Sequence, residues 1–128
     1  MAAIQSPRIR KVITIASGLS ISAAVDQEGY RIAALDMSSG WDAANRMTFR
    51  GAASGASTFY DLYNASGVEL SIASGAPLTS TTGRGLCFAA ALTDALAARR
   101  YVKIQSGPSS APVNLTTGVT VGVLLLPL

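Results

Sequence analysis

The chain has 128 residues, 49% of them hydrophobic, and its ten basic and seven acidic residues give a net charge of +3. A chain of this length predicts one domain with a hydrophobic core of its own. The single cysteine, Cys87, excludes an intramolecular disulfide and a cysteine-based zinc site, and the absence of histidine removes most acid–base chemistry near neutral pH.

The N-terminal part of the chain predicts an arm followed by a strand. Residues 1–7 show no periodic pattern, whereas the side chains of residues 8–15 indicate a strand. Short termini are normally disordered unless a partner holds them. We therefore expect residues 1–10 to form an ordered, extended arm on a neighbouring subunit or on a capsid, and residues 11–128 to form the single domain.

Further strands are predicted over residues 19–25, 30–37 and 47–50. In the last of these, Met47 and Phe49 fall on one face and their polar neighbours on the other, as in a half-buried strand. Trp41, the only tryptophan, lies in the loop before this strand. It is interpreted as a cap on the core, with a platform for stacking a sugar as the alternative.

The middle of the chain predicts a β-hairpin and a loop. Residues 60–72 form two strand-like segments around Asn64 and Gly67, which tolerate the positive φ of a tight turn. Tyr60 in this hairpin is a second candidate platform. Gly83-Arg84-Gly85 is interpreted as a loop, and Cys87 as a small buried hydrophobe.

The last third of the chain predicts one short helix and two strands. Residues 93–99 favour a helical turn, with Thr93 or Asp94 as its N-cap. Strands follow over residues 101–105 and 119–126, and Tyr101 in the first of them is a third candidate platform.

The final strand carries apolar side chains on both faces from Leu124 onwards, so something must cover it. The cover is either the chain's own N-terminal segment or a neighbouring subunit. We expect the leucines to bury against a second chain. The candidate assembly interface consists of Arg8, Arg10, Leu124, Leu126 and Leu128.

No residue pattern indicates catalysis. The acidic residues form no recognisable pair, and neither Lys11 nor Lys103 stands in a motif that would activate a serine. The basic clusters around Arg10 and Arg100 are interpreted as solvated strand faces. The apolar C-terminal stretch is far shorter than the roughly 20 residues of a membrane-spanning helix. We expect no enzyme activity, no cofactor, no metal, and neither nucleic acid nor membrane as a partner.

Short strands separated by Gly, Ser and Asn, with almost no helical periodicity, predict the fold class. It is all-β: an antiparallel β-sandwich, jelly-roll-like, with at most one short helix near residues 93–99.

The order of several short motifs resembles a group of small virion proteins of tailed phages, which also occur in gene transfer agents. The resemblance covers residues 12–126, with residues 52–57 replacing the acidic, glycine-rich turn usual in that group. Residues 98–104 are also similar to one strand of discoidin-type jelly rolls, many of which bind carbohydrate. The motifs that carry the main resemblance are Gly40-Trp41-Asp42-Ala43-Ala44, Met47-Thr48-Phe49-Arg50, Phe59-Tyr60-Asp61-Leu62-Tyr63, Gly67-Val68-Glu69-Leu70 and Arg100-Tyr101-Val102-Lys103-Ile104-Gln105-Ser106-Gly107.

The resemblance implies a non-enzymatic structural protein located in the virion, either a capsid decoration protein or the base of a head spike or fibre. Its partners would be other virion proteins, such as the major capsid protein or a spike or fibre protein, and further copies of itself in a homo-oligomer. The alternative is a carbohydrate-binding module of a fibre or tail. That module would use Trp41, Tyr60 or Tyr101 as platforms, with Arg99 or Arg100 directed toward acidic sugars.

Overall fold

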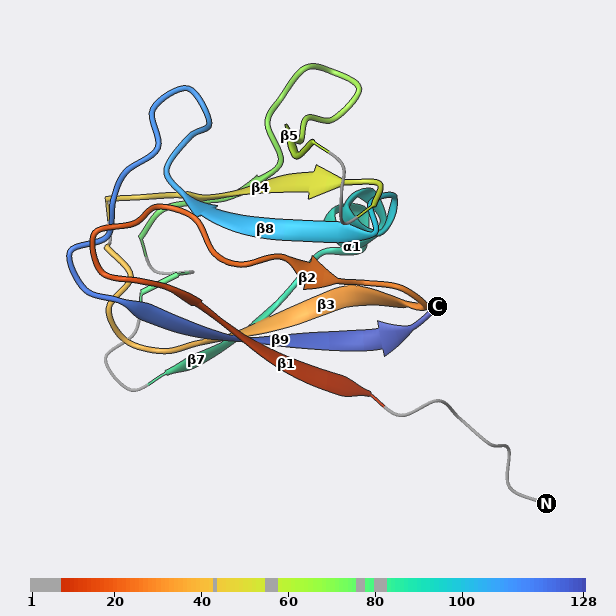
Figure 1. Ribbon diagram of the computed structural model, residues 1–128, viewed down its shortest axis with the longest axis horizontal. Coiled ribbons are helices and arrows are strands. Elements are labelled where there is room, and N and C mark those ends of the chain that lie inside the picture. Colours follow the sequence, from red (N-terminus) through yellow and green to blue (C-terminus); the bar gives the residue numbers. More distant parts are fainter. Residues whose placement is uncertain (1–7, 43, 55–57, 76–77, 80–82) are drawn as a thin grey trace.

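The structure is a computed structural model that describes residues 8–42, 44–54, 58–75, 78–79 and 83–128. It shows two antiparallel sheets packed face to face, with one short helix (Figure 1). The elements are β1 (Ile9–Ile15), β2 (Val25–Asp26), β3 (Tyr30–Met37), β4 (Met47–Ala52), β5 (Tyr60–Asp61), β6 (Ser71–Ile72), β7 (Arg84–Cys87), α1 (Ala90–Ala97), β8 (Tyr101–Ser106) and β9 (Val119–Pro127).

The connectivity is that of a jelly roll. One sheet has the order β1-β9-β3-β7, and the other has the order β2-β8-β4-β5, with β6 also pairing with β4. The first strand therefore pairs with the last, and the second pairs with the last but one. This nested order across two sheets characterises the jelly roll among sandwiches. The predicted fold class is confirmed.

The core lies between the sheets because each strand directs alternate side chains inward. Strand β9 shows this most clearly, with buried residues at every second position: Val119, Val121, Val123 and Leu125. A β-bulge between Ile32 and Ala34 shifts the inward set of β3 by one residue, so that Leu35 follows Ile32 in the core. Burying one such aliphatic side chain stabilises the fold by about 1.5–3 kcal/mol.

Several predicted strands are confirmed with small changes at their ends, namely those over residues 8–15, 30–37, 47–50, 101–105 and 119–126. The strand predicted over residues 19–25 is wrong for most of its length. Only Val25 and Asp26 form β2, with one isolated bridge from Ile21 to Gln105. The backbone there still follows the edge of β8, since Ser22 N–H donates to the Ile104 carbonyl.

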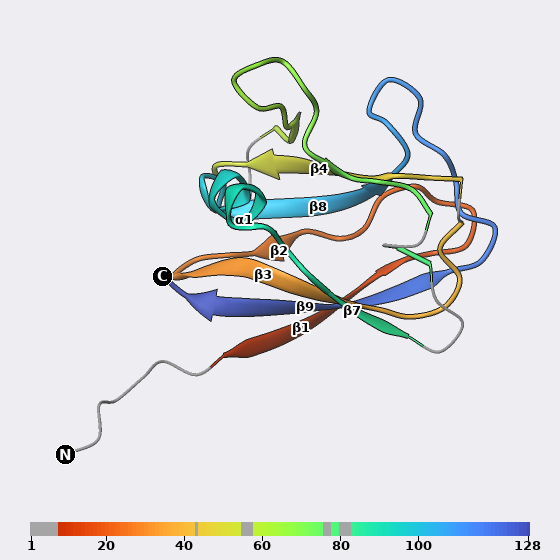
Figure 2. The same ribbon diagram turned by 180° about the vertical axis from the view of Figure 1, so that it is seen from behind.

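The predicted hairpin is correct at its tip and wrong at its ends. Asn64 N–H donates to the Val68 carbonyl, and the backbones of Tyr63 and Glu69 are bridged. The outer segments, however, both leave the hairpin to pair with β4 instead of with each other. The hairpin and the loop after β8 rise from the outer side of the five-stranded sheet (Figures 1 and 2).

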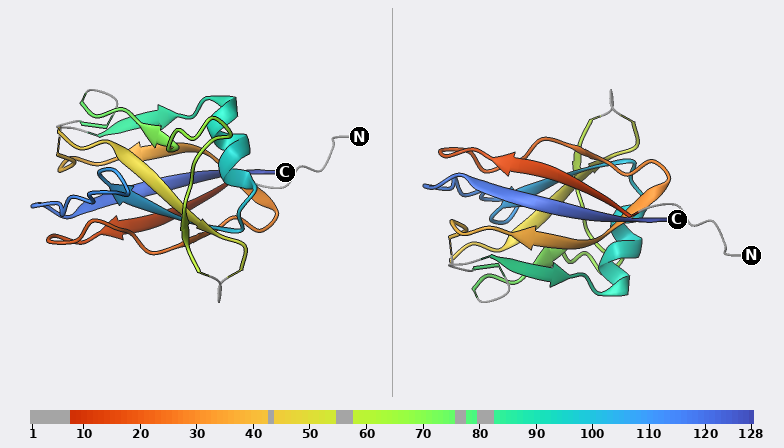
Figure 3. Two further views of the ribbon diagram at one scale, coloured as in Figure 1. Left: turned by 90° about the horizontal axis from the view of Figure 1, so that it is seen from above. Right: turned by 90° about the horizontal axis from the view of Figure 1, so that it is seen from below.

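The helix begins earlier than predicted, and its predicted cap is wrong. It spans Ala90–Ala97 with Ala89 as N-cap and no side-chain cap, so Thr93 and Asp94 lie inside it. Packing positions it instead, because Leu96 is fully buried and Leu92 packs against the core. It lies at the end of the sandwich where the C-terminus also lies (Figure 3).

Two predictions about residues 83–87 are also wrong. Arg84–Cys87 forms the edge strand β7, whereas Gly83-Arg84-Gly85 was expected to be a loop. Cys87 is exposed and not buried. The reason is its register opposite Ala34, which directs its side chain to the outer face, while Leu86 lies opposite the buried Leu35.

Candidate functional site

The outer face of the four-stranded sheet brings together residues that are far apart in the sequence. Arg10 of β1 lies opposite Leu124 of β9, which lies opposite Ala34 of β3, which lies opposite Cys87 of β7. Residues paired in this way share one side of a sheet. The neighbouring rows add further side chains. We term this surface the β1/β9 face and define it by Arg8, Arg10, Val12, Ala34, Cys87, Leu124 and Leu126.

Apolar side chains are exposed on the β1/β9 face. Val12 is 55% exposed, and Leu124 and Leu126 are half-buried. Leu128, just beyond β9, is 76% exposed. Arg31 of β3, which lies opposite Leu126, adds a further basic group on the other side of β9 from β1. The face therefore carries exposed apolar side chains among basic groups.

An ion pair crosses this face above Gly122. The Arg10 Nε donates to Asp36 Oδ2 at 3.1 Å, spanning from β1 to β3 across β9. This reach is possible because Gly122 has no side chain, and a Cβ there would collide with the Arg10 guanidinium. An open depression of about 360 Å³ lies beside the pair, lined by Arg10, Asp36, Met37, Ser38, Ser39, Gly83, Thr120 and Gly122.

Charged groups close the side of the sandwich between the edge strands β1 and β2. The Lys11 Nζ donates to the Asp26 carbonyl at 3.1 Å. The Arg100 Nε lies 3.2 Å from Asp26 Oδ1, and the Arg100 Nη2 lies 2.7 Å from Glu28 Oε2. The hydrogen bond from the Arg100 guanidinium holds the pKa of the Asp26 carboxyl below its ordinary value and raises the pKa of Arg100.

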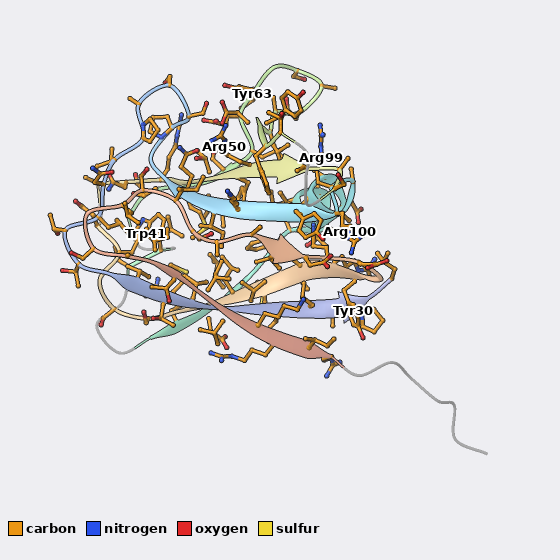
Figure 4. All side chains as sticks on the ribbon, in the orientation of Figure 1. Tyr30, Trp41, Arg50, Tyr63, Arg99 and Arg100 are labelled. Carbon is orange, nitrogen blue, oxygen red and sulfur yellow. The ribbon has the colours of Figure 1, made fainter. Side chains whose placement is uncertain are left out.

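The three candidate platforms lie in different surroundings. Trp41 is 5% exposed and lies between the sheets, where its Nε1 donates to the Asn45 carbonyl (Figure 4). The suggestion that Trp41 is a platform is therefore wrong, because its side chain is buried in the core, and its interpretation as a core residue holds. Tyr60 is 59% exposed, with the Arg99 guanidinium 6.0 Å from its ring centre. Tyr101 is half-buried, with Arg100 at 5.1 Å.

The candidate assembly residues lie mostly together. Arg10, Leu124 and Leu126 share the β1/β9 face, and Arg8 lies exposed just before β1. Of the predicted arm, Ile9 and Arg10 pair with β9 of the same chain, and residues 1–7 lie outside the described residues.

Sequence reasoning missed Val12, Ala34 and Cys87 on the β1/β9 face. Ile13 and Ile15 alternate with Arg10, Val12 and Thr14, and this pattern could have indicated that Val12 points outward. Ala34 and Cys87 join the face only through strand pairing, which no local pattern shows.

None of the described residues forms a helix long and apolar enough to cross a membrane. Within the same residues, no group of three or more His, Cys, Asp or Glu side chains could hold a metal ion. Comparison of the chain with protein-family models, with curated proteins and with solved structures finds no match.

Proposed function

We propose that the protein is a non-enzymatic structural protein of a tailed-phage particle, acting as a capsid decoration protein or as the base of a head spike. In this proposal it binds another virion protein, or a further copy of itself, through the β1/β9 face. The observation that carries the proposal is the set of exposed apolar side chains on that face, to which β1 and β9 contribute.

Single exposed apolar side chains are ordinary on protein surfaces, whereas contiguous ones rimmed by polar groups mark interaction sites. Leu124 and Leu126 are neighbours on the outer face of β9, whereas Val12, opposite Gly122, is separated from them by the Arg10 side chain that extends over Gly122. The arginines beside these side chains favour a partner surface that combines apolar and acidic groups.

The basic residues on β1 also favour docking through the face of the sheet. β1 is an edge strand, and its outer backbone groups could pair with any strand of another chain. Charged side chains such as Arg8, Arg10 and Lys11 discourage uncontrolled pairing of this kind. A partner that binds specifically would therefore use side chains of the β1/β9 face.

The architecture supports this class of function by analogy. Jelly rolls build many viral capsid domains and also lectin domains. The order of the short motifs resembles small tailed-phage virion proteins. Because one fold serves many functions, the surface and not the fold identifies the partner.

The test is incorporation into particles. Particles carrying the chain are purified and their composition is measured by mass spectrometry, for the native chain and for Val12→Lys and Leu126→Lys. Each variant places a charge at an exposed apolar position of the β1/β9 face, and we expect occupancy to fall at least tenfold while the thermal unfolding curve of the isolated chain stays similar.

The matched control is Val68→Lys, because Val68 is 60% exposed, comparable to Val12 at 55%, but lies in the hairpin of the other sheet. It should leave occupancy unchanged. The proposal fails if the native chain is absent from purified particles, or if Val12→Lys and Val68→Lys have equal effects.

A further inference from the structure

The outer face of the five-stranded sheet carries a second cluster, composed of polar and aromatic groups. Lys103 of β8 lies opposite Arg50 of β4, which lies opposite Asp61 of β5. In the next row, Gln105 lies opposite Thr48. The hairpin and the loop after β8 rise on either side of these rows (Figures 1 and 2).

Three side-chain atoms on this side of the sheet are buried without a hydrogen-bond partner among the described residues: Arg50 Nε, Gln105 Oε1 and Glu69 Oε2. Arg50 Nε lies 3.2 Å from Asp61 Oδ1, which makes an ion pair but not an aligned hydrogen bond. Gln105 is 5% exposed, and the Glu69 side chain is 8% exposed.

Unpartnered groups of this kind are rare in native proteins, because each one costs free energy on burial. They are retained where a ligand or ordered water completes their hydrogen bonds. Here one donor and two acceptors lie on the same side of one sheet. A ligand that satisfies all three must therefore both accept and donate hydrogen bonds.

The surroundings favour a ligand with negative charge. The Lys103 Nζ lies 4.3 Å from the centre of the Phe59 ring, and no carboxylate is paired with it among the described residues. Lys103 also lies directly opposite Arg50, an arrangement of like charges that an anion would relieve. Asp61 offsets part of the charge of Arg50 only.

Exposed aromatic surface completes the cluster. Tyr63 is 52% exposed, and its hydroxyl lies 3.1 Å from the Ser109 hydroxyl, so that it bridges the hairpin to the loop after β8. Figure 4 shows Tyr63 above Arg50 on the outer side of the sheet. Aromatic rings provide the surface on which the C–H faces of sugar rings pack.

We propose that this face binds a carboxylate-bearing sugar unit of an acidic polysaccharide. The sugar carboxylate accepts hydrogen bonds from Arg50 and Lys103. Sugar hydroxyls donate to Gln105 Oε1 and Glu69 Oε2, and the ring packs on Tyr63. Because the three unpartnered atoms are covered in this structure, the proposal requires the hairpin and the loop after β8 to move apart, which breaks the hydrogen bond between Tyr63 and Ser109.

A nucleic acid fits this face less well than an acidic sugar. Asp61 and Glu69 lie among the cations and would repel a chain that carries a phosphate at every unit. The same carboxylates accept hydrogen bonds from sugar hydroxyls. A neutral polysaccharide would leave the Lys103 ammonium without an anion.

The test is binding of the full chain to immobilised uronic-acid oligosaccharides, with the same oligosaccharides reduced at the carboxyl group as the comparison. We expect binding to the acidic forms and at least about tenfold weaker binding to the reduced forms. Lys103→Gln and Gln105→Leu should each weaken binding to the acidic forms by a similar factor.

The matched control is Arg31→Gln, which removes a positive charge from the opposite sheet and should leave sugar binding unchanged. Thermal unfolding of each variant identifies any loss of the fold. Lys103 is a half-buried surface residue, so Lys103→Gln still tests the proposal if Gln105→Leu unfolds. Absence of binding, equal binding to acidic and reduced forms, or tighter binding to single-stranded DNA at the same ionic strength would overturn the proposal. The β1/β9 face is not involved, so this outcome is independent of incorporation into particles.

Discussion

Two glycines, Gly122 and Gly51, lie in strands and are both in contact with arginine side chains, yet they should respond differently to substitution. A Cβ on Gly122 would meet the mobile end of Arg10, which can move away at the cost of an exposed ion pair. A Cβ on Gly51 would lie 2.7 Å from Arg99 Cγ and 3.1 Å from Leu62 Cδ1, and these atoms cannot move as freely.

We therefore expect Gly122→Ala to change the free energy of unfolding by less than about 1 kcal/mol, and Gly51→Ala to lower it by about 1–3 kcal/mol. Urea denaturation of both variants measures the difference. Equal losses in the free energy of unfolding for the two variants would show that these contacts do not determine the effect of the substitutions.

The pair between Asp26 and Arg100 should make stability sensitive to acid. The hydrogen bond from Arg100 lowers the pKa of Asp26 in the folded chain, so the stabilisation is present above the ordinary pKa and is lost as the pH falls through the lowered value. Urea denaturation between about pH 5 and about pH 2.5 should show a smaller loss of stability for Asp26→Asn than for the native chain. An identical pH dependence for both chains would contradict this expectation.

At the scale of elements, Gln27 connects the turn before β3 to the end of α1. It is 3% exposed, its Nε2 donates to the Leu96 and Arg99 carbonyls, and its Oε1 accepts from the Ile32 N–H. It thereby adds a second hydrogen bond to the Leu96 carbonyl, which also accepts from the Arg99 N–H, and it ties the end of the helix to the start of β3.

Replacing Gln27 by Ala removes three hydrogen bonds, including those to the Arg99 carbonyl and from the Ile32 N–H. The expected loss in the free energy of unfolding is about 2–4 kcal/mol, measured by chemical denaturation. Ser38→Ala is the comparison, because Ser38 also bonds to backbone but at an exposed site, with its Oγ accepting from the Thr120 N–H at 3.3 Å. Ser38→Ala should lower the free energy of unfolding by less than about 1 kcal/mol. Similar losses for both would mean that Gln27 does not hold the helix end.

The elements also show what local sequence can predict. The strand over residues 30–37 was predicted from the sequence. The bulge at Ala33, which shifts the set of side chains that point into the core, was not predicted. The segment 84–87 carries one glycine and no alternation, so its pairing with β3 has no local signal. Helix α1 has no side-chain cap to mark its start.

At the scale of the whole molecule, the sequence predicts the class of the fold but not which strands are neighbours. The pairing of β1 with β9 joins residues more than 100 positions apart, and this pairing creates the β1/β9 face. Arg10, Leu124 and Leu126 were predicted as assembly residues from their own segments. Gln105, Glu69 and Arg50 were not singled out as a site, because their missing hydrogen bonds become visible only in three dimensions.

The central claim is that the β1/β9 face is buried in an assembled particle. The chain's single cysteine, Cys87, lies exposed on this face and reports on it directly. The measurement is the rate of maleimide labelling of Cys87 in the isolated chain and in purified particles. A control chain carries Cys87→Ala and Ser110→Cys, because Ser110 lies exposed in the loop after β8.

We predict that Cys87 reacts readily in the isolated chain and at least tenfold more slowly in particles, while the control thiol reacts at the same rate in both. Equal labelling of Cys87 in the isolated chain and in particles that contain it at normal occupancy would contradict the account.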